Sequence, residues 1–306
     1  MKKKRSFNPV SAALVALIVI LILAAVVPFL VFKGQYSFSN FWHLFFTKIF
    51  NWNAFVSAFG PIIEKIPMSL ELTVISGFFG LTLGLLLALV RVNKIPVLNP
   101  IRAVFVSFTR GTPILVQLYL TYTGVPLILQ AINLNYNTNY NINAIPTAVL
   151  AIIAFSFNEA AYNSETIRAA IQSVDKGQIE AAKSLGMTPF QVFMGVTLPE
   201  AARVATAPLG NSLIGLLKGT SLAFVVSVVE MTAQAQILAG STFRTFETYF
   251  ALALIYWVLC IVLENLIRLI EYRLDVHMPR RSTGKFMMDS LSNPFKPAVK
   301  GAQKND

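Results

Sequence analysis

The chain has 306 residues, of which 55% are hydrophobic and only 13% are charged, and its mean hydropathy is +0.63. Apolar runs of about 20 residues, long enough to cross a hydrocarbon core about 30 Å thick, recur along it and exclude an ordinary soluble domain. The net charge of +11 would suit nucleic acid, but Lys and Arg gather between the apolar runs, which is typical of a membrane protein with no nucleic-acid partner.

Six membrane-spanning helices are expected, so the predicted fold class is an all-α integral membrane protein. The expected ranges are 11–33, 67–91, 112–130, 146–165, 208–232 and 247–270. The first follows Lys2–Arg5 and resembles a secretory signal, but its length and the lack of a small-residue cleavage site favour an uncleaved span.

Basic residues predict the orientation of these spans. They lie at the amino terminus, at 91–102, at 166–207 and in the tail, whereas residues 131–145 contain none. Because Lys and Arg are enriched in cytoplasmic loops, both termini and the 166–207 connection are expected to be cytoplasmic.

Residues 34–66 form the first outer connection, which is rich in Phe and Trp. Aromatic side chains favour the lipid–water boundary, so we expect an interfacial helix here. In the second span, Gly80 and Gly84 have the GxxxG spacing that accompanies close helix packing.

Residues 98–111 are expected to form a short amphipathic cytoplasmic helix that leads into the third span. The sequence RGTPILVQ then begins at Arg110, where Thr112 is expected to cap the exposed amides and Pro113 suits the first helical turn. Arg110 either anchors the inner boundary or lies beside a translocation path.

Polar residues in the spans are candidates for a substrate pathway, because charged groups in a bilayer usually face a cavity or protein. Asn158, Tyr162 and Glu165 share one helical stripe. Glu159 is suited to an α-amino group, and the region of Thr220 and Ser221 to an α-carboxylate. The structural alternative is that Glu159 and Glu165 pair with Lys218 or Arg168 and brace the bundle. Glu71 and Glu230 lie near the outer boundary, where solvation explains them. The candidate pathway residues are Asn158, Glu159, Tyr162, Glu165, Lys218, Thr220, Ser221, Arg110 and Gln117.

Residues 175–199 are too mixed in character to span a bilayer. Lys176–Leu185 favour helix, Gly186 is suited to a left-handed end, and Thr188 with Pro189 starts a second helix at a new angle. Small side chains on the first helix would let a partner surface approach closely. An ordinary amphipathic surface loop is the alternative.

The residue types in this segment indicate a particular protein family, which their spacing alone does not. Glu180-Ala181-Ala182, then Gly186, then Val196-x-Leu198-Pro199 resembles the EAA signature of ABC-importer permeases. RGTPILVQL (110–118), AYNSETIRAAIQSVDKGQIEAAKSLGM (161–187) and LLKGTSLAFVVSVVEM (216–231) resemble the polar amino-acid branch of that family. The resemblance covers roughly residues 67–270. Gly219 departs from it, because the family often has Asp beside the lysine that corresponds to Lys218.

This resemblance implies an ABC type I importer permease fold with a core at 67–270, a coupling loop at 175–199, an additional region at 1–66 and a basic cytoplasmic tail at 271–306. It implies that the segment docks on an ATPase subunit through Glu180, Ala181, Ala182, Leu185, Gly186, Leu198 and Pro199. The implied partners are a pair of ATP-binding cassette subunits, a second permease that is identical or different, an extracytoplasmic solute-binding protein and the lipid of the bacterial cytoplasmic membrane.

The sequence contains no GxxxxGK[ST] loop, so ATP and Mg are expected on the partner ATPase, with no cofactor and no enzymatic activity in this chain. The predicted function is therefore the permease half of an amino-acid importer. A secondary amino-acid carrier is the alternative, but it would need its own ion site, and no dense intramembrane acidic cluster is visible. A channel would not need the EAA segment.

Overall fold

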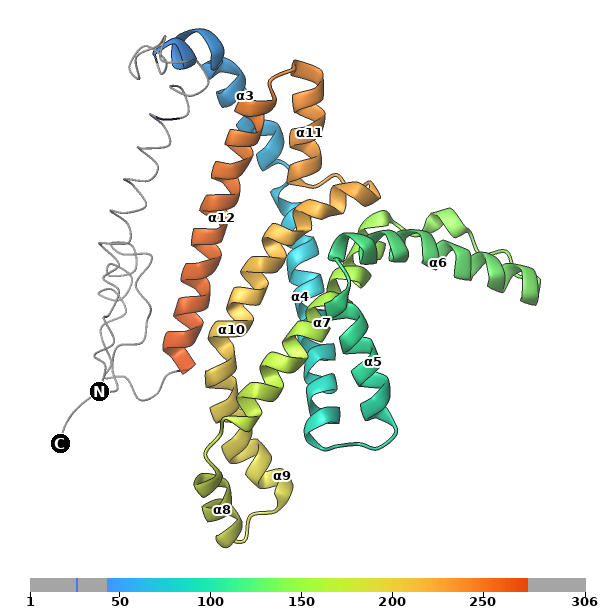
Figure 1. Cartoon of the computed structure of the whole chain (residues 1–306), viewed down its shortest axis with the longest axis vertical. Coiled ribbons are helices and arrows are strands. Elements are labelled where there is room, and N and C mark those ends of the chain that lie inside the picture. The colour runs from blue at the N-terminus through green and yellow to red at the C-terminus, as the bar shows by residue number, and fades with distance from the viewer. Residues whose placement is uncertain (1–25, 27–42, 275–306) are drawn as a thin grey trace, which may run out of the picture. The chain divides into compact units, whose positions relative to one another are not determined.

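The computed structural model describes residue 26 and residues 43–274, and the chain divides between Ser57 and Ala58 into two units. Every regular element of the described residues is helical, as the predicted all-α class requires (Figure 1). The expected first span at 11–33 lies outside the described residues, and so does the tail beyond 274.

The first unit contains part of the aromatic outer connection. The π-helix η1 covers Phe45–Ile49, and α3, Trp52–Ile63, begins in this unit. The rings of Phe50 and Trp52 pack edge to face with centroids 4.9 Å apart. The Trp52 side chain stays 55% exposed, as suits a residue at a lipid–water boundary.

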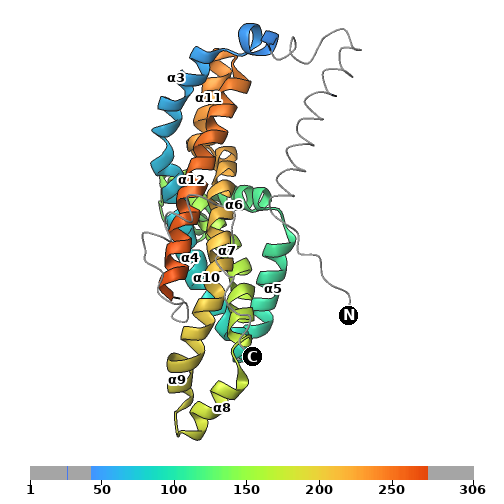
Figure 2. The ribbon, with the colours of Figure 1, turned by 90° about the vertical axis from the view of Figure 1, so that its left-hand side faces the viewer.

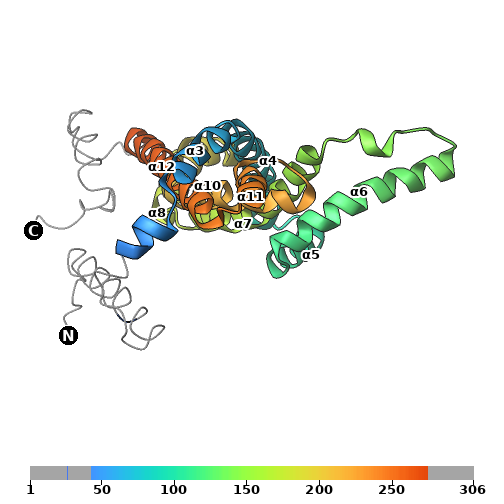
Figure 3. The same cartoon turned by 90° about the horizontal axis from the view of Figure 1, so that it is seen from above.

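The second unit is a bundle in which α4, Ile66–Val92, and α7, Thr147–Gln172, lie side by side (Figures 1 and 2). α10 packs against both of them, α12 packs against α10 and α11, and α6 runs away from the bundle (Figure 3). The remaining elements are α5 Leu98–Gly111, α6 Ile114–Tyr136, η2 Ile142–Ala144, α8 Lys176–Ser184, α9 Pro189–Val192, η3 Phe193–Thr197, α10 Leu198–Gly219, η4 Thr220–Val226, α11 Met231–Thr242 and α12 Thr245–Leu274.

Glycine permits the close approach of α4 to α7. A Cβ atom added to Gly80 would lie 2.4 Å from the Cβ of Glu159, and one added to Gly84 would lie 3.1 Å from the Cβ of Asn163. Both distances are shorter than ordinary carbon–carbon contacts, which are about 3.5–4.0 Å. The GxxxG spacing therefore marks a real helix contact, as predicted.

Four helical runs among the described residues are long and apolar enough to cross a membrane: Ile66–Val92, Ile114–Tyr136, Pro189–Val226 and Thr245–Arg273. Three agree with expected spans. The fourth corrects the expected span at 208–232, because the helical run begins well before Pro208 and ends at Ser227, which is left-handed with φ 64°. α7 is too polar to be among the four, so the expected span at 146–165 and the total of six remain predictions.

Glu230 corrects another expectation. It is fully buried rather than solvated, and its carboxylate accepts hydrogen bonds from the amides of Thr232 and Ala233, both at 2.9 Å. The Tyr256 hydroxyl donates to the same carboxylate at 3.2 Å. Glu230 is thus the N-cap of α11, a helix that stands where the sequence suggested only an outer connection.

The glycine contact gives a prediction about stability. Gly80→Ala should lower the thermal unfolding midpoint of the purified full-length protein by several degrees, because an overpacked methyl costs about 1–3 kcal/mol. The matched control is Gly124→Ala in α6, where an added Cβ meets nothing within 4 Å. That control should be neutral or stabilising, since alanine is the better helix former. Equal midpoints for the two variants would contradict the α4–α7 contact.

Candidate functional site

One stripe of α7 faces α5 and the start of α6. It carries Asn158, Tyr162 and Glu165, the three residues that the helical spacing placed together. The Asn158 amide donates to the Gln117 side-chain oxygen at 3.1 Å, and the Arg110 guanidinium lies 5.3 Å from the Tyr162 ring centroid. The fold therefore brings five of the candidate pathway residues to one side of α7: Arg110, Gln117, Asn158, Tyr162 and Glu165.

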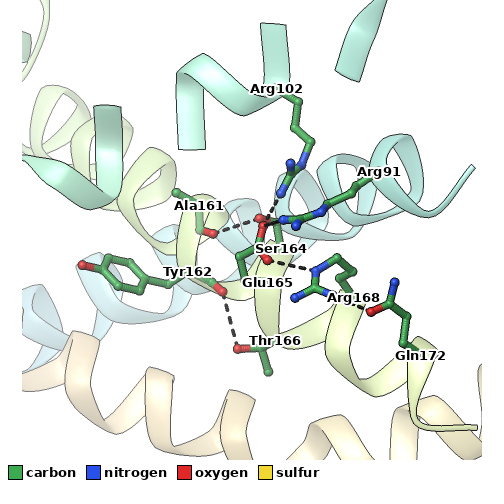
Figure 4. Close-up of polar contacts among 9 residues, drawn as sticks. All are labelled: Arg91, Arg102, Ala161, Tyr162, Ser164, Glu165, Thr166, Arg168 and Gln172. Carbon is green, nitrogen blue, oxygen red and sulfur yellow. Dashed lines mark hydrogen bonds and ion pairs between the residues drawn. The ribbon is translucent and has the colours of Figure 1, made fainter. Parts of the chain in front are cut away.

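At the end of this stripe, Glu165 is surrounded by arginines. Arg91 from α4 and Arg102 from α5 both donate to its Oε1 atom, and Arg168 donates to Oε2 at 2.9 Å (Figure 4). Glu165 thus joins three helices through charge-assisted hydrogen bonds. The expected pair with Arg168 is present, and the structure favours the bracing role of Glu165 that the sequence left open.

Gln117 fixes the elbow between α5 and α6. Its buried side-chain amide donates to the carbonyls of Thr109 at 2.7 Å and Thr112 at 3.0 Å. The expectation that Thr112 caps the next helix is wrong, because its hydroxyl donates back to the Phe108 carbonyl and Pro113 occupies the N-cap position. The turn is instead stabilised by Gln117, a polar side chain further along the chain.

Glu159 lies on a different face of α7, against α4 and α10. Its carboxylate accepts hydrogen bonds from Ser212 at 2.7 Å and Asn163 at 3.2 Å, and only 8% of the residue is exposed. The expected ion pair with Lys218 or Arg168 does not form. Neutral donors on α7 and α10 satisfy this carboxylate instead.

The KGTS region of α10 and η4 separates into buried and exposed residues. Thr220 is fully buried, and its hydroxyl donates to the Leu217 carbonyl at 2.7 Å. Ser221 is partly exposed, and Lys218 is exposed. Asn211 and Gly215 share the exposed face of Lys218, at helical spacing.

Residues 175–199 form two short helices and the start of α10, at one end of the second unit (Figure 2). Asp175 caps α8, and Thr188 forms a capping box with Gln191 at the start of α9. Gly186 has φ +81°, the left-handed conformation that was predicted. The predicted helix–turn–helix is therefore present.

The docking candidates are not all on the surface of this segment. Glu180, Ala181, Leu185, Gly186 and Pro199 are exposed and Leu198 is partly exposed, whereas Ala182 is buried. Ala182 is thus a packing residue. The sequence also gave no role to Phe190, which is 71% exposed and lies in the same segment as Leu185 at 84%. The available signal was a large aromatic residue directly after the helix start at Thr188 and Pro189.

Comparison with known proteins gives consistent results. Residues 80–276 match the family described as binding-protein-dependent transport system inner membrane component. The chain is 42% identical over 221 residues to the probable amino-acid permease protein YxeN of Bacillus subtilis, covering 72% of this chain and 94% of that protein. It is 35% identical to the L-cystine transport system permease protein TcyL of the same organism, with coverages of 76% and 95%.

A third relative is the glutamine transport system permease protein GlnP of Escherichia coli, which is 33% identical, with coverages of 74% and 99%. Among solved structures, a chain of an amino acid ABC transporter crystallised with histidines aligns with a TM-score of 0.63. It is 33% identical and covers 73% of this chain and 99% of its own length. The chain thus belongs to the binding-protein-dependent transport system inner membrane component family, the permease subunits of ABC importers.

Proposed function

We propose that this permease subunit moves an amino acid or a close analogue inward across the bacterial cytoplasmic membrane, driven by ATP hydrolysis in a partner chain. The names of the relatives support this substrate class, since cystine and glutamine both carry an α-amino and an α-carboxylate group. Neither the individual amino acid nor the identity of the second permease enters the proposal.

The exposed charge of Lys218 is the observation that carries the proposal. It is exposed on a helical run that is otherwise apolar enough to span the membrane, and no carboxylate of the described residues pairs with it. A charged group in contact with lipid is costly, so such residues normally face a water-filled cavity or another protein. We infer that Lys218 faces the substrate path and attracts the α-carboxylate.

The same face of α10 extends this path. Gly215 and Asn211 lie about one and two turns before Lys218, respectively, and are also exposed, while Ser221 follows about one turn after it. Glu159 acts indirectly, because its carboxylate holds Ser212, the neighbour of Asn211. On α7, Asn158 contributes the partly exposed amide that Gln117 orients. Glu165 braces the helices, and Arg110 and Tyr162 lie beside it.

We assign residues 175–199 to the docking of the ATPase subunit, within a permease core at 67–270. Leu185 and Phe190 supply most of the exposed apolar area of a segment that also exposes charged and polar residues such as Glu180. Large apolar anchors surrounded by polar groups are typical of the centre of a protein interface. The positive φ of Gly186 sets the angle between α8 and α9, and so the relative placement of these anchors.

The assembly that we propose contains two permeases, two ATPase subunits and an extracytoplasmic solute-binding protein. The far half of α6 supports a second permease, because this helix runs away from the bundle with few neighbours (Figure 3). Both termini and the docking segment are cytoplasmic in this proposal, and residues 131–145 are outside.

Topology can be tested by labelling. In a parent protein without Cys260, Asn139→Cys should react with a membrane-impermeant maleimide in intact cells. Gln178→Cys should react only after the cells are opened, because it lies on α8, which is cytoplasmic in this proposal. Both positions are exposed in the chain, so reactivity reports on the side of the membrane. Labelling of position 178 in intact cells would reverse the orientation and remove the docking proposal.

Substrate transport can be tested after reconstitution with the ATPase and the solute-binding protein. The complex should take up at least one zwitterionic amino acid, and Lys218→Gln should reduce uptake about tenfold or more, as expected for losing one charge-assisted contact. Lys65→Gln, at the N-cap of α4, is the control and should transport normally. Uptake of sugars, metals or oligopeptides alone would exclude the amino-acid assignment. Uptake driven by an ion gradient without the ATPase would instead indicate a secondary carrier.

Coupling can be tested at Gly186. Gly186→Val should leave membrane insertion intact but weaken ATPase association and abolish substrate-stimulated ATP hydrolysis, because a β-branched residue is strained at φ +81°. Gly186→Asn is the matched control, since asparagine tolerates this conformation and an added Cβ meets nothing within 4 Å. Glu180→Lys should have a milder effect. Co-purification and transport by the Val variant at the level of the Asn variant would disprove the docking role.

A further inference from the structure

An open cleft of about 750 Å³ lies between α4, α5 and α7, and arginine dominates its polar lining. Arg91, Arg102 and Arg110 all line it, together with Tyr162 and Glu165. Arg168 contacts Glu165 from its own helix, so this carboxylate pairs with three guanidinium groups, those of Arg91, Arg102 and Arg168 (Figure 4). Arg110 adds a further guanidinium to the lining without pairing with Glu165. The cleft therefore has a strong excess of positive charge.

Two of these arginines have unused hydrogen-bonding capacity. Arg110 contacts the Tyr162 ring, but no carboxylate of the described residues pairs with it. Arg102 is only 6% exposed, and its Nε atom is buried without a hydrogen-bond partner. A buried donor without an acceptor is unfavourable, so an anionic ligand with several acceptor oxygens would satisfy the cluster.

The outer face of α5 beside the cleft is apolar, and none of the described residues covers it. Val97, Ile101, Val104 and Phe108 recur at helical spacing and are 73%, 63%, 71% and 55% exposed. The opposite face of the same helix carries Arg102 and Val106 into the bundle. An exposed apolar helix face of this kind is suited to contact with acyl chains.

The combination of these two features identifies the ligand class. A soluble anion would satisfy the arginines but would make no contact with the stripe from Val97 to Phe108. An uncharged lipid would cover the stripe but would leave the positive charge uncompensated. A phospholipid with an anionic headgroup does both, and basic pockets between membrane helices bind such headgroups.

We propose that the cleft between α4, α5 and α7 binds the phosphate headgroup of an anionic phospholipid, whose acyl chains cover the apolar stripe of α5. Arg110 is then an anchor at the membrane interface, one of the two roles that its position allowed. This site does not depend on the transported substrate or on the orientation of the chain, so it goes beyond the proposed function and can fail independently of it.

The proposal can be tested by native mass spectrometry of the full-length protein in detergent, with phosphatidylglycerol and phosphatidylcholine of the same acyl chains as probes. Phosphatidylglycerol should be retained in preference. Arg110→Gln should weaken its retention about fivefold, the factor that one basic residue is worth beside an anionic headgroup. Ser107→Asp, which places a negative charge in the exposed lining of the cleft, should weaken retention at least as much.

The control is Arg203→Gln, which removes the same charge from a residue of α10 paired with Glu200 outside the cleft, and should leave retention unchanged. Val104→Ser should also weaken retention, because it interrupts the apolar stripe. Thermal unfolding checks that each variant is folded. If Arg110→Gln does not fold, Ser107→Asp still tests the cleft.

Three results would overturn the proposal. The first is retention of phosphatidylglycerol that neither Arg110→Gln nor Ser107→Asp changes. The second is displacement of the lipid by excess inorganic phosphate together with no effect of Val104→Ser, which would identify a site for a soluble anion. The third is that Val104→Ser changes the number of permease copies in the complex but leaves the bound lipid unchanged, which would identify the stripe as a protein interface.

Discussion

The contact between α4 and α7 determines where the candidate pathway residues of α7 lie. Because Gly80 and Gly84 present no side chains, the backbone of α4 reaches the Cβ atoms of Glu159 and Asn163. This contact occupies one face of α7 and directs Asn158, Tyr162 and Glu165 toward α5 and α6. Bulkier residues at the two glycines would move α7 outward. The α7 side chains that contact α5, α6 and α10 would move with it.

The polar residues of α7 are stabilised in two different ways. Glu165 is paired with arginines of three helices, so its charge is compensated within the protein. Glu159 has only hydroxyl and amide donors, which orient it without compensating a charge. The first arrangement holds elements together strongly but is costly to assemble away from water, whereas the second leaves room for adjustment between α7 and α10. Two acids six residues apart therefore have different physical roles.

The sequence could predict local features whose causes are local. The left-handed turn at Gly186, the start of a helix at Thr188 and the close packing at Gly80 each depend on a few neighbouring residues, and all three are present. The stripe of Asn158, Tyr162 and Glu165 follows from helical geometry alone. Family motifs indicated the permease family, because several separate stretches matched in one order.

Features that depend on distant partners could not be predicted in the same way. Arg91 and Arg102 are far from Glu165 in sequence, and they entered the sequence argument only as indicators of orientation. Glu230 was expected in solvent because nothing nearby reveals that α11 begins there and needs an acceptor for its first amides. The expected span at 208–232 begins and ends later than the helical run, because the run starts in the docking candidate segment at Pro189 and stops at Val226, before the left-handed Ser227.

That unbroken run has a mechanical consequence. It extends from Pro189 to Val226, 38 residues, or about 57 Å at the usual helical rise. The wide turn of η3 and Pro208 are the places where it can bend, since π-turns and prolines are the common causes of helix kinks. Between them the segment is stiff. If neither place bends, a tilt of about 5° at one end of a rod this long displaces the other end by roughly 5 Å. Bending at η3 or Pro208 therefore decides how much of a rotation beside α9 reaches η4.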